Sequence, residues 1–202
     1  MIKFAKSRSE YFTELKSFGM DSVPPLTLKE GSLFFKAAVD FATRRHVLST
    51  VRLLRLRRLM YAAVKEGIVG PFRLHFSFKV KDFAYMTDSG DVYLSVFKIV
   101  RSADIQNFKI ALHELGHIYI SGMAGYADLL RLDAEVVEAL GKTENAAILS
   151  PVEVYATAVG CALISAVADM ASGKFKSAAE ALVSEEVNKI LTSLKETPIS
   201  ET

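Results

Sequence analysis

The stretch FKIALHELGHIYISG, residues 108–122, contains the pattern His-Glu-Leu-Gly-His inside a segment of helical periodicity. Apolar residues recur there at spacings of three and four, which predicts one apolar helix face: Phe108, Leu112, Leu115 and Tyr119. We expect this helix to begin after Ser102, a plausible N-cap residue, and to end near Gly122.

His113 and His117 give this helix a candidate metal site. The two residues are four apart, so they lie one turn apart on the same face. That spacing lets two imidazoles approach one ion at the ~2.0–2.1 Å that zinc requires. Glu114 is rotated by about 100° from His113, where it can act as a general base toward a metal-activated water. The alternative is an ordinary helix whose histidines are buried or hydrogen-bonded without a metal.

A hydrolytic zinc site also needs a third protein donor. Glu153 opens the most apolar segment of the chain, where a lone carboxylate is costly to bury unless it is paired or metal-bound. However, Ser150 to Glu153 also forms a capping box with Pro151 at the first helical position, which alone explains the glutamate. We favour Glu153 as the ligand and keep Glu135 and Glu138 as alternatives, although their segment resembles an amphipathic surface helix.

The periodicity along the chain predicts helices, then a small sheet, then helices again. Helical spacing covers residues 8–18 and about 32–67, and it returns after Arg101. Strands are predicted between these segments, at residues 72–80, 82–87 and 91–100. We therefore expect an α+β fold with a small antiparallel sheet. Residues 1–70 form an N-terminal helical segment in this interpretation, packed on a core of residues 71–202 as one compact unit.

The segment 91–121, DVYLSVFKIV followed by the histidine motif, resembles the edge strand and active-site helix of the zincin metallopeptidases, and the likeness extends over about residues 72–172. The metzincin branch would need a glycine and a third histidine where Ile120 and Met123 stand. SPVEVYATAVGCAL, residues 150–163, is similar to the Glu-x-x-Ala helix of the compact ImmA/IrrE-type gluzincins, with Glu153 in the matching place. Thr157 occupies the position of an aspartate in thermolysin-like enzymes.

The resemblance implies a zinc-dependent peptidase in which His113, His117 and Glu153 hold Zn²⁺ and Glu114 is the general base. It also implies a peptide or protein substrate that pairs with the edge strand, for which the candidate is residues 91–100. Three tyrosines near the motif are candidate oxyanion donors, and the sequence favours none of them: Tyr119, Tyr126 and Tyr155. Two alternatives stay open: a non-catalytic, zinc-stabilised regulatory protein, and a latent peptidase whose N-terminal helices cover the cleft.

Charge is distributed unevenly along the chain. Residues 1–70 carry 13 Lys/Arg against 6 Asp/Glu, a net charge of +7, and the remainder carries 12 against 17, a net charge of −5. The excess is concentrated in RRHVLSTVRLLRLRR, residues 44–58. We expect this segment to dock on the rest of the molecule or on an acidic partner, because motifs that read nucleic-acid bases are absent from the sequence.

Composition also bears on the location of the protein. The single cysteine, Cys161, favours a reducing compartment, and the N-terminus has no apolar signal core, so we expect a cytoplasmic protein. The apolar run at residues 156–168 is shorter than the roughly 18 residues that a membrane span needs, which predicts a buried helix and no membrane span. The oligomeric state stays open.

Overall fold

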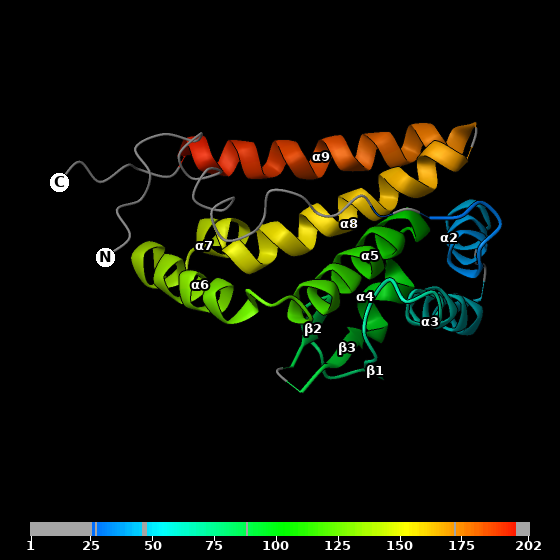
Figure 1. Ribbon diagram of the computed structural model, residues 1–202. Coiled ribbons are helices and arrows are strands. Elements are labelled where there is room, and N and C mark those ends of the chain that lie inside the picture. Colours follow the sequence, from blue (N-terminus) through cyan, green and yellow to red (C-terminus); the bar gives the residue numbers. More distant parts are fainter. Residues whose placement is uncertain (1–25, 27, 46–47, 88, 172, 197–202) are drawn as a thin grey trace.

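A computed structural model describes residues 26, 28–45, 48–87, 89–171 and 173–196, and the helix expected at residues 8–18 lies outside them. The described part contains eight helices and three strands (Figure 1). The helices are α2 (Leu33–Thr43), α3 (Ser49–Lys65), α4 (Val96–Arg101), α5 (Asp104–Ser121), α6 (Tyr126–Leu140), α7 (Glu144–Leu149), α8 (Pro151–Met170) and α9 (Lys174–Glu196). The strands are β1 (Arg73–Ser77), β2 (Ala84–Met86) and β3 (Asp91–Ser95).

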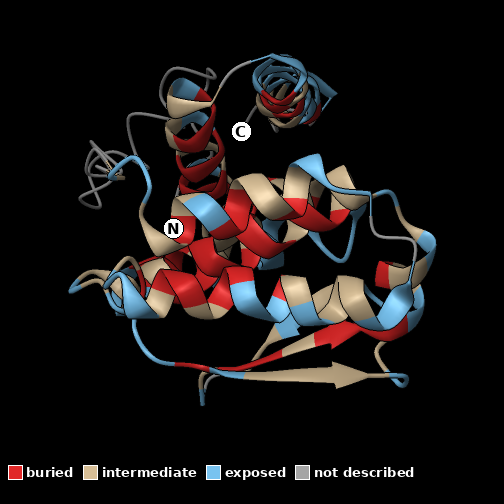
Figure 2. Ribbon diagram, turned by 90° about the vertical axis from the view of Figure 1, so that its right-hand side faces the viewer, coloured by how far each residue is buried: buried red, intermediate tan, exposed pale blue. Residues whose placement is uncertain are grey.

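The elements stack in layers, with the sheet below α5, α8 above α5, and α9 above α8 (Figure 1). Buried residues gather on the sides of these helices that face one another (Figure 2). The core residues of α5 and α8 include Phe108, Leu112, Leu115, Val159 and Leu163, each at most 1% exposed. The apolar face predicted for residues 108–122 is therefore the centre of the core, and α5 ends at Ser121 with Gly122 as its C-cap.

Two glycines let α5 and α8 approach closely. A Cβ atom on Gly116 would lie 2.2 Å from the carbonyl oxygen of Ala156, far inside van der Waals contact. A Cβ atom on Gly160 would lie 3.2 Å from the Cα of His113. Because no side chain separates the backbones at these points, residues of α8 reach the face of α5 that carries the two histidines.

The α+β class is confirmed, but the sheet is mixed and not wholly antiparallel. β3 lies in the middle, parallel to β1 and antiparallel to β2. The chain reverses once between β1 and β2 and again in the turn Thr87–Gly90, where the Gly90 amide donates to the Thr87 carbonyl (2.9 Å). Two reversals make the third strand parallel to the first. Gly90 takes a φ of 78°, which favours glycine at the end of this turn.

The strand expected over residues 91–100 is only half correct. Strand pairing stops at Ser95, whose hydroxyl accepts from the Lys98 amide (3.5 Å) and caps helix α4. Ser102 is the C-cap of α4, and α5 instead begins after Ala103, which makes no side-chain cap. Since β3 is paired on both sides, it is not an edge strand, and the strand with an open edge beside α5 is β2.

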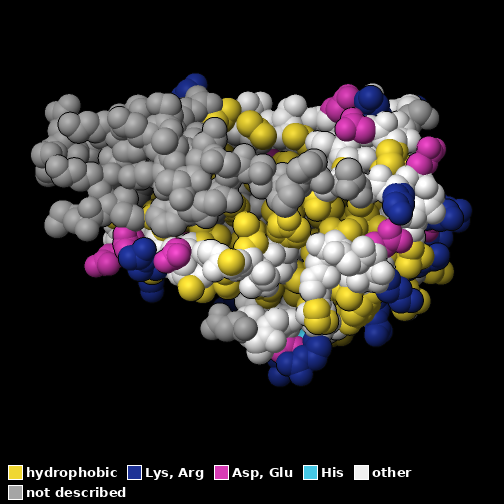
Figure 3. All heavy atoms as spheres, in the orientation of Figure 1, with side chains coloured by type: hydrophobic (Ala, Val, Ile, Leu, Met, Phe, Trp, Pro, Cys, Tyr) yellow, Lys and Arg dark blue, Asp and Glu magenta, His cyan; other side chains and the backbone are white. Residues whose placement is uncertain are grey.

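The N-terminal helices share one hydrophobic core with the rest of the described chain, and the helical stretch expected over 32–67 breaks between α2 and α3. Arg52 of α3 donates to the carbonyl oxygens of Ile99, Val100 and Ser102 at 2.7–3.1 Å, and it pairs with Asp104 at 2.7 Å. Part of the basic segment thus packs within the molecule. Other Lys and Arg side chains stand out along the right-hand edge of Figure 3, where α2 and α3 lie.

Among the described helices, only α8 is long and apolar enough to cross a membrane. In the structure 56% of its most apolar window is buried inside the protein. This burial agrees with the expectation of a buried helix at residues 156–168. A helix in the core of a protein can have the same length and apolar composition as a membrane-spanning helix.

Candidate metal centre

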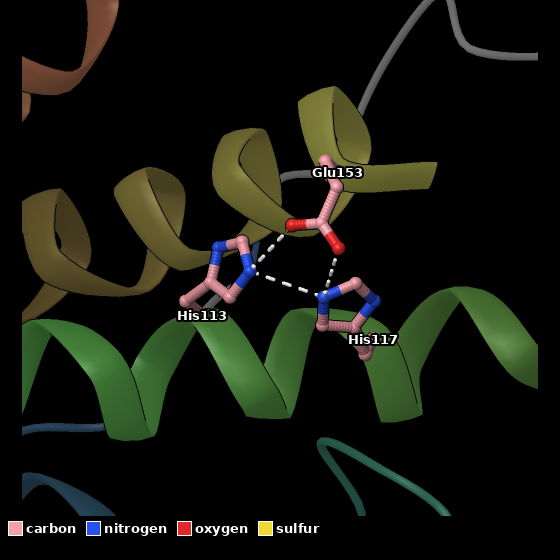
Figure 4. A group of neighbouring side chains, drawn as sticks. All are labelled: His113, His117 and Glu153. Carbon is pink, nitrogen blue, oxygen red and sulfur yellow. Dashed lines mark hydrogen bonds and ion pairs between the residues drawn. The ribbon is translucent and has the colours of Figure 1, made fainter. Parts of the chain in front are cut away.

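Three side chains from two helices converge above α5 (Figure 4). His113 Nε2 lies 3.0 Å from His117 Nε2 and 3.1 Å from Glu153 Oε2. His117 Nε2 lies 3.4 Å from Glu153 Oε1. Within the described residues, this is the one group of three or more His, Cys, Asp or Glu side chains arranged to hold a metal ion.

The spacing of these atoms fits a tetrahedral zinc ion. Ligands at ~2.0–2.1 Å from zinc with tetrahedral angles lie about 3.3 Å from one another. Here the two histidine nitrogens are 3.0 Å apart, and each lies 3.1 or 3.4 Å from its own nearer oxygen of the Glu153 carboxylate. Two imidazoles and one carboxylate are also a donor set that hydrolytic zinc sites use. The residues present therefore fit zinc in both chemistry and separation.

Glu153 reaches the histidines from the third position of α8. The Glu153 amide donates to Ser150 Oγ (3.5 Å), with Pro151 at the first helical position, so the predicted cap is present. The reciprocal half of a capping box is not formed, because the Ser150 amide donates to Ala146 O (2.9 Å). The backbone of Glu153 thus serves the cap while its carboxylate faces the histidines, and the two hypotheses for this residue are compatible.

Asp133 of α6 holds the beginning of α8 in place. Its Oδ1 accepts a hydrogen bond from the Ser150 hydroxyl and another from the Val152 amide (3.1 Å). A carboxylate at this end also favours the helix dipole. The sequence did not predict this contact, because an aspartate 17 residues before a capping serine forms no recognisable motif.

The alternative ligands Glu135 and Glu138 do not join the group. Both lie on α6, whose buried face is formed by Leu129, Leu132 and Val136. Glu138 is exposed and Glu135 is half-buried. The structure thus brings Glu153, and neither alternative, to the two histidines.

Glu114 is 5% exposed and faces the cavity beside the histidines. Its Oε2 is buried and has no hydrogen-bond partner among the described residues. Burial raises the pKa of this carboxyl, while the neighbouring His113 and His117 act in the opposite direction. A buried carboxylate with one unused oxygen and a raised pKa suits a group that takes up a proton.

The charges of His117 and Glu153 are coupled. Burial acts to raise the pKa of Glu153, but hydrogen bonds from His113 and His117 and their charges hold it well below its usual range. Burial also acts to lower the pKa of His117, and the hydrogen bond and charge of Glu153 outweigh it and raise that pKa. Without a metal, the two groups therefore favour an ion pair.

Thr157 contacts the far side of His113. Its Oγ1 lies 3.2 Å from His113 Nδ1, while Nε2 of the same ring faces Glu153. If Nδ1–H donates to the hydroxyl, the lone pair of Nε2 is free for a metal. In the sequence, Thr157 stood out only as a departure from the resemblance to thermolysin-like enzymes, and the structure adds that its hydroxyl contacts the His113 ring.

A cavity of ≈ 300 Å³ opens over the three-residue group. Its lining comes from β2, α5, α6 and α8: Ala84, Tyr85, Met86, Thr87, His113, Glu114, His117, Tyr126, Val152 and Glu153. Of the three candidate tyrosines, Tyr126 is in this lining and Tyr119 and Tyr155 are not. No residue of α2 or α3 lines the cavity, so these two helices do not cover it.

Comparison with known proteins gives no match: no family model fits the chain, and no curated protein or solved structure is significantly similar to it. The candidate site therefore rests on the motif and on its geometry.

Proposed function

We propose that this protein is a zinc-dependent peptidase of the gluzincin type, with His113, His117 and Glu153 as the metal ligands. The observation that carries the proposal is the convergence of two imidazole nitrogens and the two oxygens of one carboxylate, at 3.0–3.4 Å, on the face of α5 that also presents Glu114 to a cavity. A helix with two incidental histidines would not need a carboxylate from a second helix at this spacing.

Zinc, when bound, would act as a Lewis acid that lowers the pKa of water, so that water can lose a proton and act as a nucleophile near neutral pH, and it would also polarise the substrate carbonyl. Glu114 then acts as the general base: its carboxylate takes up a proton and passes it to the leaving amine. Thr157 orients the His113 ring, and the cap at Ser150 fixes Glu153. Of the three candidate oxyanion donors we favour Tyr126, because it lines the cavity and the other two tyrosines do not.

The substrate strand is β2, which replaces the residues 91–100 expected from the sequence. β2 has one edge that is not paired with another strand of the described sheet, and Ala84 to Thr87 line the cavity. An extended peptide can add to such an edge through backbone hydrogen bonds, which select for an extended chain more than for particular side chains. This geometry supports a peptide or protein as the substrate class.

The test is hydrolysis of a quenched-fluorescence peptide library by the zinc-loaded protein and by its Glu114→Gln variant. Glutamine has nearly the same shape but does not accept the proton, so we expect the rate to fall at least about 100-fold with zinc still bound. Equal rates in the two proteins would exclude Glu114 as the base. Bound zinc with no hydrolysis of any peptide would favour the non-catalytic, zinc-stabilised alternative.

A further inference from the structure

Phe78 and Phe97 form an exposed aromatic pair at one end of the sheet. Phe78 is 66% exposed and Phe97 is 51% exposed, and their ring centroids are 5.4 Å apart in an edge-to-face arrangement. Phe78 follows β1, and Phe97 lies in the first turn of α4. Large aromatic side chains that remain this exposed and also contact each other mark a surface for binding.

Four cations lie within four residues of these phenylalanines in the sequence, and we call the six residues together the basic aromatic patch: Phe78, Lys79, Lys81, Phe97, Lys98 and Arg101. The Arg101 guanidinium lies 5.8 Å from the centre of the Phe97 ring, and Lys98 Nζ lies 5.2 Å from that of Phe83. Within the described chain, none of the four cations is within ion-pair distance of a carboxylate. The described residues thus leave these four positive charges without an ion pair, although the exposed Asp82 adds one negative charge to the same loop.

The chain leads from the patch into the strand that lines the cavity. The chain passes from Phe78 through Phe83 directly into β2, and the Ser95 hydroxyl donates to the Val80 carbonyl (3.0 Å), which fastens this loop to the end of β3. The residues of β2 then line the cavity from Ala84 onward. An extended chain paired with the open edge of β2 would therefore leave the cavity over the patch at one of its two ends.

We propose that the basic aromatic patch binds an acidic segment of the protein substrate that also carries a large apolar side chain, on one side of the scissile bond. This inference rests on the proposed function for the identity of the cavity. Carboxylates complement the four cations, and an aromatic or aliphatic side chain covers the Phe78–Phe97 pair. Bases of a nucleic acid are a poorer fit to the adjacent sheet face, because the Tyr93 ring is already stacked between His75 (4.7 Å) and Tyr85 (4.9 Å).

The test is fluorescence anisotropy of a labelled twelve-residue peptide of Asp, Glu and Phe, titrated with the full-length Glu114→Gln protein so that binding is read without cleavage. The variant Phe78→Ser/Lys79→Glu removes one exposed apolar side chain and reverses one charge of the patch. Val187→Ser/Lys189→Glu makes the same two changes at exposed positions of α9, where Val187 is 44% exposed, and is the matched control. We expect the patch variant to weaken binding about tenfold or more and the control to bind as the parent does.

Two further arms identify the partner. A peptide with every acidic residue changed to Lys should not bind, and vesicles of phosphatidylcholine and phosphatidylserine should not sediment with the protein. Absence of acidic-peptide binding, equal loss in the control, or sedimentation with the anionic vesicles in place of peptide binding would overturn the inference. Patch-dependent binding together with absent hydrolysis in the wild-type protein would support the patch and contradict only the peptidase.

Discussion

Gly116→Ala tests the packing that brings Glu153 to the histidines. The added Cβ would lie 2.2 Å from the Ala156 carbonyl oxygen and 2.8 Å from its carbonyl carbon. Normal contact is about 3.5 Å, and backbone atoms cannot rotate away, so α8 has to move about 1 Å from α5. Glu153 is one turn before Ala156, so the ligand separations of 3.0–3.4 Å must widen.

We expect Gly116→Ala to weaken zinc binding by about 10–100-fold and to lower the free energy of unfolding by about 1–3 kcal/mol. Zinc affinity is measured by competition with a fluorescent chelator, and stability by urea unfolding of the metal-free protein. Gly122→Ala is the control, because its Cβ would make an ordinary 3.5 Å contact with the Tyr119 carbonyl oxygen at a φ of −87°. Wild-type zinc affinity and stability in Gly116→Ala would refute the close approach of the two helices.

Three other predictions concern the groups around the site. Thr157→Val, which removes the hydroxyl beside His113, should weaken zinc binding by about 10–100-fold in the same competition assay, and Thr157→Ser should restore it. In the metal-free protein, the raised pKa of His117 stabilises the fold below the ordinary histidine pKa of about 6.5, and this contribution is lost as the pH rises through the raised value. The lowered pKa of Glu153 contributes above the ordinary glutamate pKa of about 4.3, and that contribution is lost only as the pH falls. In thermal scans above about pH 6.5, the unfolding midpoint of the metal-free protein should therefore fall as the pH rises. The difference in midpoint between the zinc-loaded and metal-free proteins should grow over the same range, because zinc binds neutral histidine. Midpoints of the two forms that change with pH in parallel would contradict the pairing of His117 with Glu153. Arg52→Ala should cost on the order of 3 kcal/mol in urea unfolding, since the side chain is 13% exposed and ion-paired, yet leave zinc stoichiometry unchanged.

The histidine-bearing helix could be predicted from the sequence because its signal is local. The apolar residues of 108–122 repeat at helical spacing over several turns, and the i, i+4 relation of His113 and His117 follows from helix geometry alone. Three of the four residues of the predicted apolar face, Phe108, Leu112 and Leu115, are buried in α5 as expected, and Tyr119 is half-buried.

Residues 96–100 show where a local pattern is insufficient. The sequence VFKIV has the β-branched and aromatic composition of a strand. In the structure it forms a short helix instead, in which Val96 and Ile99 are buried and Phe97 is exposed. The Ser95 cap decides in favour of the helix, and a single serine inside an apolar run is too weak a signal to recognise beforehand. The expectation that residues 91–100 form an edge strand failed for a separate reason, because β3 lies between β1 and β2 and strand order leaves no local signal in the sequence.

Glu153 shows a limit of a different kind. The sequence allows two roles for this residue, a helix cap and a metal ligand. The serine and proline before it predict the cap, and they do not bear on whether the carboxylate binds a metal. Which way the carboxylate points depends on how closely α8 approaches α5, and that distance is set by Gly116 and Ala156, 40 residues apart. Such a long-range contact leaves no periodicity in one sequence, so the third ligand needs the three-dimensional structure.

The zinc content of the protein, measured by native mass spectrometry after loading and buffer exchange, decides whether His113 and His117 hold a metal ion. The wild-type chain should retain one zinc ion, and the His113→Ala/His117→Ala variant should retain none while remaining folded by circular dichroism. A wild-type chain that holds no zinc, or a variant that keeps one ion per chain, would contradict the site.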